Sequence, residues 1–375
     1  MKLAKIRIEN FRHLGAGGKP FELDFTDPLG RVRDFTLLVG PNTSGKTTVL
    51  DAIAAALGPS LEMPTLRPGF KLSPRTVVSR GALQAKVTCW LRFDDEEIRT
   101  ADEVLKLAEL PGFASALPPT PNLKLTWIYP DTKHNLSGGW SEFDHDPGGS
   151  VLLLTRNRIP FLLGTGRVTW DWLKRAGGAF TFDQERTGWG KTISRQVWNI
   201  IHGTTEAAAE NPDLRTTDPR TILVDLALQS LVPSVNADPR ALDPFAAIRD
   251  RYADVCAPRR IVGAVRDELN EFSIRFSDGR QEYGYEGLSS GEKMLLLLVI
   301  RFVSEHIHRS VVLIDELELN QHPLWQRRLL HMIPRMGDNN QIIATTHSPY
   351  LRDAVPPDAV IELGGLGDDS RAEGA

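Results

Sequence analysis

The chain has 375 residues, of which 41% are hydrophobic and 25% charged, and a formal net charge of −4 at pH 7. This composition is typical of a soluble globular protein with one domain and a large insertion or with two intimate domains, and the acidic balance excludes a generally basic nucleic-acid coat. The two cysteines, Cys89 and Cys256, are too few for a disulfide framework, which suits a reducing compartment. No apolar run resembles a signal peptide or a membrane span. We therefore expect a cytoplasmic protein without membrane contact.

The first 100 residues carry a regular pattern of apolar positions. The pattern predicts a strand around Ile6 and Ile8, a buried strand at 35–39, a helix at 49–57 that stops at Gly58-Pro59, and a strand at 87–93. Strands that alternate with a helix in this way indicate an α/β fold.

The pattern weakens between residues 101 and 262, where proline-rich and glycine-rich stretches separate mixed helical segments. We interpret this segment as a mainly helical insertion. Order returns at 263–363, with a helix face at 295–303 and buried strands at 311–314 and 342–345. Residues 364–375 are rich in glycine and acidic residues and are predicted to be a disordered tail.

A phosphate-binding loop stands between the strand at 35–39 and the following helix. The segment Gly40–Thr47 fits the pattern G-x-x-x-x-G-K-[ST] in the strand–loop–helix context that a P-loop requires. Backbone N–H groups of such a loop and the helix N-terminus bind phosphates. The predicted nucleotide-binding residues are Gly40, Asn42, Ser44, Gly45, Lys46, Thr47 and Thr48. Lys46 is predicted to reach the β/γ-phosphates and assist catalysis, Thr47 to ligate Mg²⁺ and Thr48 to contact the α-phosphate of ATP.

Two adjacent acids end the predicted strand at 311–314. A buried strand delivers Asp315 and Glu316 to the sheet edge where ligands bind. We predict that Asp315 holds Mg²⁺, directly or through water, and that Glu316 acts as the general base on the attacking water.

Two further segments are interpreted by resemblance. Leu288–Glu292 resembles the signature motif of ABC-type ATPases, which implies that Ser289 and Gly291 face the γ-phosphate of ATP on an opposite subunit of a homodimer. A simple capping box of Ser289 and Glu292 is compatible with that role. His347, in Thr345–Pro349, resembles the switch histidine that contacts the γ-phosphate in these proteins.

Asn10-Phe11-Arg12 resembles the start of the SMC, RecF and OLD-family heads, which implies that Arg12 approaches the nucleotide phosphates; the alternative is a surface cation. The resemblance also implies a Q-loop glutamine that links Mg²⁺ to the second lobe. Gln184 is the candidate, and the alternative is an ordinary surface glutamine.

These elements, with Glu318, His322 and Pro323, resemble the D-E-P-E-x-x-L-H-P and T-H-S-P pattern of stand-alone bacterial AAA/ABC-like ATPases, including OLD-family heads, RecF-like proteins and the ATPases of Septu and retron phage-defence systems. The resemblance covers residues 1–100 and 280–363 and implies an ABC-type head with a mixed and parallel sheet. Leu317 and Asn320-Gln321 depart from the pattern, in the segment that crosses the dimer interface in relatives.

The insertion contains a basic, tryptophan-containing stretch. The stretch contains eight basic residues (156, 158, 167, 174, 175, 186, 191 and 195) but only three acids (171, 183 and 185), with tryptophans at 170, 172, 189 and 198. Such residues suit contacts to DNA phosphates and bases, or to a protein partner. They equally suit a partly buried helical subdomain, the reading that the acidic net charge favours.

The resemblance implies an ATP-driven switch that closes as a homodimer and controls a partner effector, such as a nuclease encoded nearby, in phage defence. Fewer than 30 residues follow Ser348, so we expect no nuclease domain after the head. The alternatives are a RecF-like repair clamp that grips DNA and a scaffold that binds ATP without turnover; Glu316 argues against the scaffold.

Overall fold

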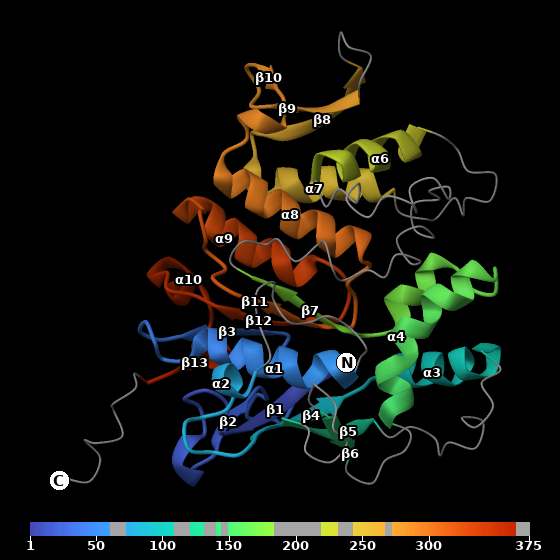
Figure 1. Ribbon diagram of the computed structural model, residues 1–375. Helices are drawn as coiled ribbons and strands as arrows, with labels where there is room; N and C mark the ends of the chain where they lie inside the picture. Colours follow the sequence, from blue (N-terminus) through green and yellow to red (C-terminus); the bar gives the residue numbers. More distant parts are fainter. Residues whose placement is uncertain are drawn as a thin grey trace.

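The computed structural model describes residues 1–60, 73–108, 121–130, 140–143, 149–183, 219–231, 243–266 and 272–364. Within these ranges the strands form two five-stranded sheets and one three-stranded sheet, stacked in layers with helices between and beside them (Figure 1). No helix of the described part is long and apolar enough to cross a membrane.

The first sheet is antiparallel, in the order β2-β1-β4-β5-β6. Its strands are β1 (Lys2–Glu9), β2 (Phe21–Asp24), β4 (Ala85–Arg92), β5 (Asn122–Tyr129) and β6 (Trp140–Phe143). Apolar residues of β1 and β4 alternate with exposed or half-exposed polar ones, because one face of the sheet packs on the core. The predicted strands near Ile8 and at 87–93 are confirmed.

The second sheet is parallel throughout, in the order β13-β3-β12-β11-β7. Its strands are β3 (Phe35–Val39), β7 (Ala179–Phe182), β11 (Val311–Ile314), β12 (Gln341–Thr345) and β13 (Val360–Glu362). Every residue of β11 and β12 is buried, as expected for central strands covered on both faces. This sheet carries all three predicted buried strands.

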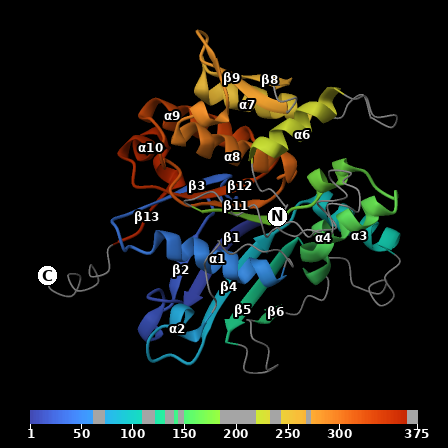
Figure 2. The same cartoon turned by 45° about the horizontal axis from the view of Figure 1, so that its top comes forward.

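Helix α1 (Lys46–Ser60) lies between the two large sheets and contacts strands of both (Figures 1 and 2). Its residues from Val49 to Leu57 are almost all apolar and buried, which suits a helix enclosed on all sides. The helix continues to Ser60, so the predicted stop at Gly58-Pro59 comes two residues too early.

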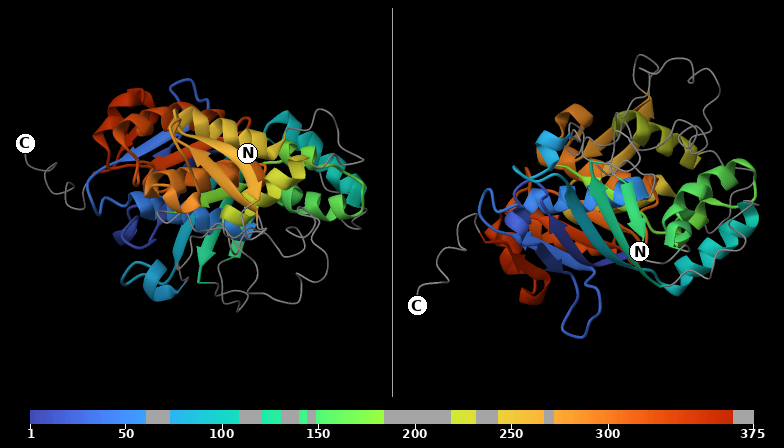
Figure 3. Two further views of the ribbon diagram at one scale, coloured as in Figure 1. Left: turned by 90° about the horizontal axis from the view of Figure 1, so that it is seen from above. Right: turned by 60° about the horizontal axis from the view of Figure 1, so that its bottom comes forward.

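The opposite face of the parallel sheet is covered by a second group of helices, which Figure 3 shows from above. This group comprises α8 (Ser290–Ser304), α9 (Pro323–Met332), α10 (Pro349–Ala354), α6 (Pro219–Leu231) and α7 (Pro244–Cys256). The three-stranded sheet of β8 (Arg260–Arg266), β9 (Phe272–Ser277) and β10 (Glu282–Tyr283) lies beyond them.

The segment 101–262, predicted as a mainly helical insertion, contributes strands to both large sheets. β5 and β6 extend the antiparallel sheet, and β7 pairs in parallel with β11. β7 is only four residues long and follows Gly177-Gly178, and so short an apolar run carries no usable periodicity. The helices of this region include α3 (Asp95–Ala108), α4 (Gly149–Gly164) and the 3₁₀ turn at Trp170–Arg175; a short α2 (Pro74–Val77) precedes β4.

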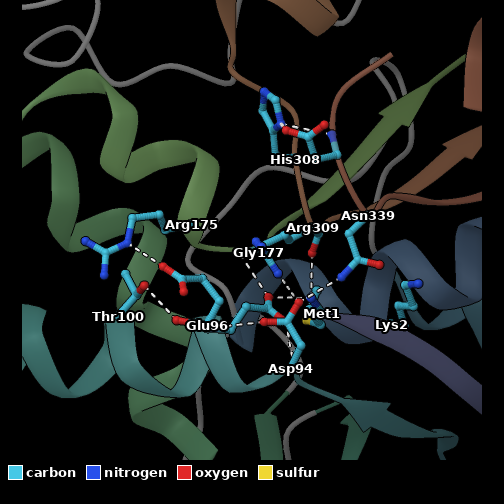
Figure 4. Close-up of polar contacts among 12 residues, drawn as sticks. Met1, Lys2, Asp94, Glu96, Thr100, Arg175, Gly177, His308, Arg309 and Asn339 are labelled. Atoms are coloured by element: carbon cyan, nitrogen blue, oxygen red, sulfur yellow. Dashed lines mark hydrogen bonds and ion pairs between the residues drawn. The ribbon is translucent and has the colours of Figure 1, made fainter. Parts of the chain in front are cut away.

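A polar cluster at the N-terminus of α3 joins the two large sheets (Figure 4). Asp94 and Glu97 form reciprocal hydrogen bonds that cap α3. Glu97 also accepts from the backbone N–H of Gly177 at 3.1 Å, while Asp94 pairs with Arg309 and accepts from Asn339 at 2.7 Å. These bonds fix the start of α3 to the loops that lead into β7 and β11.

Arg156 of α4 is a buried structural residue. Its guanidinium donates to the carbonyl oxygens of Leu173, Ala176, Glu305 and His306, and it stacks on the ring of Phe180 at 5.1 Å. Burial lowers the pKa of Arg156 to about 10, which keeps the side chain charged at neutral pH. Arg156 therefore ties α4 and the 3₁₀ turn to the C-terminal end of α8.

Replacing Arg156 with methionine is expected to lower the free energy of unfolding by about 3 kcal/mol, because several buried carbonyl groups lose their donor. Denaturant titration measures the change. The matched control is Lys174→Met, since Lys174 pairs with Asp171 in a local ion pair at i,i+3 that contributes less than about 1 kcal/mol. Equal, small effects of both variants would contradict the structural role of Arg156.

Candidate functional site

The candidate site lies at the carboxyl edge of the parallel sheet, where three neighbouring strands end. β3 runs into the P-loop, β11 ends before Asp315, and β12, which lies between them, ends before Thr346. The backbone holds these ends in register, because Thr346 N–H donates to Leu38 O and Leu317 N–H to Thr345 O. Ligands of parallel sheets bind at this edge.

The P-loop places its polar groups around the start of α1. Lys46 is 5% exposed, and its ammonium donates to the carbonyl oxygens of Gly40 and Pro41 at 2.8 and 3.0 Å. Burial lowers the pKa of Lys46, and the carboxylate of Asp315 opposes this shift most strongly. Ser44 is also buried, and its Oγ has no hydrogen-bond partner among the described residues. The lysine is thus held inside the loop that the sequence predicts to wrap phosphates.

The other predicted P-loop residues lie in the same turn. Asn42 is exposed, Thr48 is buried in α1, and Gly45 adopts a φ of +95° that favours glycine. A Cβ at Gly45 would also lie 2.8 Å from Nε2 of His13, so a side chain there would require His13 to shift.

Thr47 and Asp315, 268 residues apart in the chain, meet at this edge. The Thr47 hydroxyl lies 3.0 and 3.2 Å from the two carboxylate oxygens of Asp315. A hydroxyl and one carboxylate are the protein ligands that Mg²⁺ takes when nucleotide phosphates and water supply the rest. This donor set fits the magnesium site that the sequence predicts.

Thr345 is a site residue that the sequence reasoning missed. Its hydroxyl donates to Asp315 Oδ1 at 2.7 Å and accepts from the backbone N–H of Glu316 at 2.8 Å. The side chain is fully buried at the end of β12. Thr345 therefore orients both acids from the neighbouring strand.

Thr345→Val is expected to slow ATP turnover by about 10–100-fold, because loss of this hydrogen-bond partner would loosen the groups that are predicted to bind the metal. Thr345→Ser keeps the hydroxyl and should retain most of the activity. Steady-state phosphate release at varied Mg²⁺ measures both variants, and equal rates for Val and Ser would show that the hydroxyl does not orient the acids.

Glu316 has the environment expected of a general base. Its backbone φ is +47°, a conformation that costs energy in a non-glycine residue and is common where function demands it. Desolvation and the adjacent carboxylates of Asp315 and Glu318 raise the pKa of Glu316 above its ordinary value. Its affinity for a proton is thereby increased toward the range in which a base works near neutral pH.

His347 is exposed at the same edge, directly after β12. Its backbone N–H donates to Glu318 Oε1 at 2.5 Å, and the hydroxyl of Thr346 donates to Glu318 Oε2 at 2.7 Å. Glu318 therefore holds the loop of residues 346–348, which we call the switch loop. The backbone of His347 is thus fixed by Glu318, while its side chain is exposed to solvent.

Ser289 is the N-cap of α8 and forms a capping box with Glu292. This capping box is compatible with the predicted role of Ser289 in nucleotide binding. Buried Glu292 also accepts a hydrogen bond from Tyr252 of α7 at 2.8 Å and lies 3.5 Å from Arg259. Ser289 stays exposed and Gly291 is buried. These contacts fix the N-terminus of α8 against the lobe formed by α7 and β8.

Arg12 lies beside the P-loop helix. Its guanidinium binds buried Asp51 of α1 at 2.7 Å, and its φ is +54°. Gln184 lies outside the described residues; β7, which pairs with β11, ends two residues before it.

Three of the described basic residues in this stretch are buried or paired, whereas Arg158 is half-exposed and Arg167 is exposed. Arg156 is buried, Lys174 pairs with Asp171, and Arg175 pairs with Glu96 and Glu103 while covering Trp172. These contacts match the interpretation as a partly buried subdomain. Residues 186, 191 and 195 lie outside the described ranges.

Comparison with known families finds AAA domains at both ends of the chain. Residues 5–104 match a family described as "AAA domain", and residues 210–353 match one described as "AAA domain, putative AbiEii toxin, Type IV TA system".

Two curated relatives share part of the chain. The Septu protein PtuA of Bacillus thuringiensis is 35% identical over 115 residues, covering 27% of this chain and 28% of PtuA. The "Retron Ec83 probable ATPase" of Escherichia coli is 36% identical over 75 residues, covering 17% of this chain and 14% of the relative. The chain thus spans under a third of the length of either relative.

Among solved structures, an SMC head bound to the C-terminal winged-helix domain of ScpA aligns with a TM-score of 0.53 at 16% identity, covering 96% of each chain. This likeness establishes the fold, as the sequence predicts: an ABC-type head with helices around a parallel sheet. The chain therefore matches AAA ATPase domains at residues 5–104 and 210–353, and its fold is that of an ABC-type ATPase head.

Proposed function

We propose that the chain is an ATP-hydrolysing switch whose two copies close around two molecules of ATP. The observation that carries the ATP-hydrolysing part of this proposal is the contact between Thr47 and Asp315, with Thr345 orienting Asp315 and Glu316. Lys46 and the P-loop amides would bind the phosphates, and Asp315 with Thr47 would hold Mg²⁺, which supplies charge neutralisation at the β- and γ-phosphates. Glu316 would accept a proton from the attacking water.

The site of one head is open at its edge, where His347 is exposed. Ser289 lies exposed at the N-terminus of a 15-residue helix, the arrangement that binds an anion. The resemblance to ABC-type ATPases implies that a second copy presents Ser289 and Gly291 to the γ-phosphate. Measuring the mass of the protein in solution with ATP, ADP and no nucleotide tests this composite site: ATP alone should favour a dimer.

The output of the switch would lie in another molecule. Matches to a Septu protein and to a retron ATPase support a role in bacterial phage defence, with a partner effector such as a nuclease in the cytoplasm. Affinity purification followed by mass spectrometry, with and without ATP, tests for that partner. Recovery of no effector in any nucleotide state would count against this part of the proposal.

A RecF-like DNA clamp is the second candidate that the sequence leaves open. The burial of Arg156 and the ion pairs of Lys174 and Arg175 weaken it, since these three side chains are engaged within the protein, although Arg167 stays exposed. An ATP-dependent shift of duplex DNA that collapses with rising salt would favour the clamp, and absence of binding at low salt would eliminate it.

A further inference from the structure

A chain of hydrogen bonds runs from the switch loop to the signature segment, residues 288–292, within one copy of the protein. Ser348 of the switch loop donates from its hydroxyl to Gln326 Oε1 at 2.6 Å. Gln326 Nε2 donates to the carbonyl of Gln321 at 3.0 Å, and Gln321 Nε2 donates to the carbonyl of Gly291 at 2.8 Å. We call these three bonds the glutamine relay.

The relay is built of groups with little freedom. Gln326 and Ser348 are 7% and 8% exposed. The oxygen and the nitrogen of the Gln326 amide therefore both form their hydrogen bonds inside the protein. A buried polar group that loses its partner is costly, which favours keeping the bonds of Ser348 and Gln326 intact.

Close packing reinforces the link at its signature end. A Cβ added to Gly291 would lie 2.3 Å from the carbonyl oxygen of Asn320. Gly291 has helical backbone geometry at the start of α8, so the glycine is required here by the close approach of Asn320 and not by its own φ. The segment Asn320-Gln321 therefore packs directly against the signature segment.

The two ends of the relay serve different nucleotides in the proposed dimer. His347 and Glu316 would act on the ATP bound to their own P-loop, whereas Ser289 and Gly291 would face the ATP of the second copy. We propose that Gln326 and Gln321 are positioning residues that set the signature segment according to the state of the switch loop, so that each ATP site senses the other. This inference rests on the proposed function.

The test removes one link at a time and measures ATP turnover across ATP concentration. Ser348→Ala cuts the first bond, Gln326→Glu keeps the acceptor but loses the donor of the second, and Gln321→Ala cuts the third. The wild type should show a Hill coefficient clearly above one and at most about two, the number of sites, and each variant should fall to about one. Binding of ATP to the P-loop, measured at protein concentrations that keep the chain monomeric, should stay within about twofold.

A double variant separates a relay from local damage. Ser348→Ala combined with Gln321→Ala should have the same Hill coefficient and turnover as either single variant, because loss of one hydrogen bond already interrupts the relay and a second loss adds nothing. Gln341→Leu is the matched control. The side-chain amide of buried Gln341 accepts from Leu3 N–H and donates to Leu3 O, and its loss should lower stability without changing the Hill coefficient.

Three outcomes would overturn the inference. They are a wild type without cooperativity, single variants that keep the wild-type Hill coefficient, and a double variant whose loss is the product of the two single losses. A wild type that neither hydrolyses ATP nor dimerises would instead refute the proposed function, so the two failures are distinguishable.

Discussion

Glu316→Gln is expected to lower ATP turnover by about 10²–10⁴-fold while ATP binding is retained. The amide fills the same space but cannot accept the proton of the attacking water, and Lys46, Thr47 and Asp315 remain in place to bind nucleotide. Phosphate release measures turnover, and equilibrium binding of ATP measures affinity.

The control is Glu22→Gln, which removes a surface carboxylate of β2 that pairs with Lys5. It should leave turnover within about twofold of the wild type, as expected for an exposed pair. Wild-type turnover by Glu316→Gln would show that another group is the base and that the Glu316 carboxylate has no role in proton transfer.

The pH profile gives a second view of the same residue. Desolvation and Asp315 raise the pKa of Glu316, and the base must be deprotonated to act. Activity is therefore lost as pH falls through this raised pKa, so the acidic limb of kcat/KM should lie above the ordinary range of a glutamate.

Ser289→Arg is expected to reduce turnover by at least about 10²-fold without weakening ATP binding to the P-loop of the same chain. Ser289 is exposed at the N-terminus of α8, and a large side chain there would block the approach of a second copy's nucleotide. Loss of a donor that stabilises the developing charge has an effect of this size.

Mixing two inactive variants tests whether the site is shared. Lys46→Ala loses its own phosphate contacts but keeps its signature segment, and Ser289→Arg keeps its P-loop. A mixed dimer contains one complete site, so turnover should return on mixing. If mixing restores nothing, although both variants fold and Ser289→Arg binds ATP, the signature segment does not complete a site on another copy.

Local patterns predicted the parts of the site that lie along continuous stretches of chain. The P-loop, the strand before Asp315 and the capping box of Ser289 and Glu292 each have a signal within a few residues, and each has the predicted local geometry. The strand β7 was missed because four residues after two glycines give no period to read.

Contacts between distant segments were beyond the reach of such patterns. Thr345 reads as the last residue of a buried strand, and only the pairing of β11 with β12 brings its hydroxyl to Asp315. Gln321 stood out as a departure from the family pattern, but its bond to Gly291 depends on how α8 packs against the loop before α9. Arg156 was counted among cations suited to DNA until burial gave it four carbonyl partners.

The proposal that two copies close around ATP is tested most directly by the mass of Glu316→Gln in solution. Because this variant should bind ATP but not turn it over, ATP with Mg²⁺ should trap a dimer that is absent with ADP or without nucleotide, and adding Lys46→Ala should abolish it. Sedimentation or light scattering measures the mass. A mass that stays the same in all nucleotide states, while ATP is bound, would contradict the composite site.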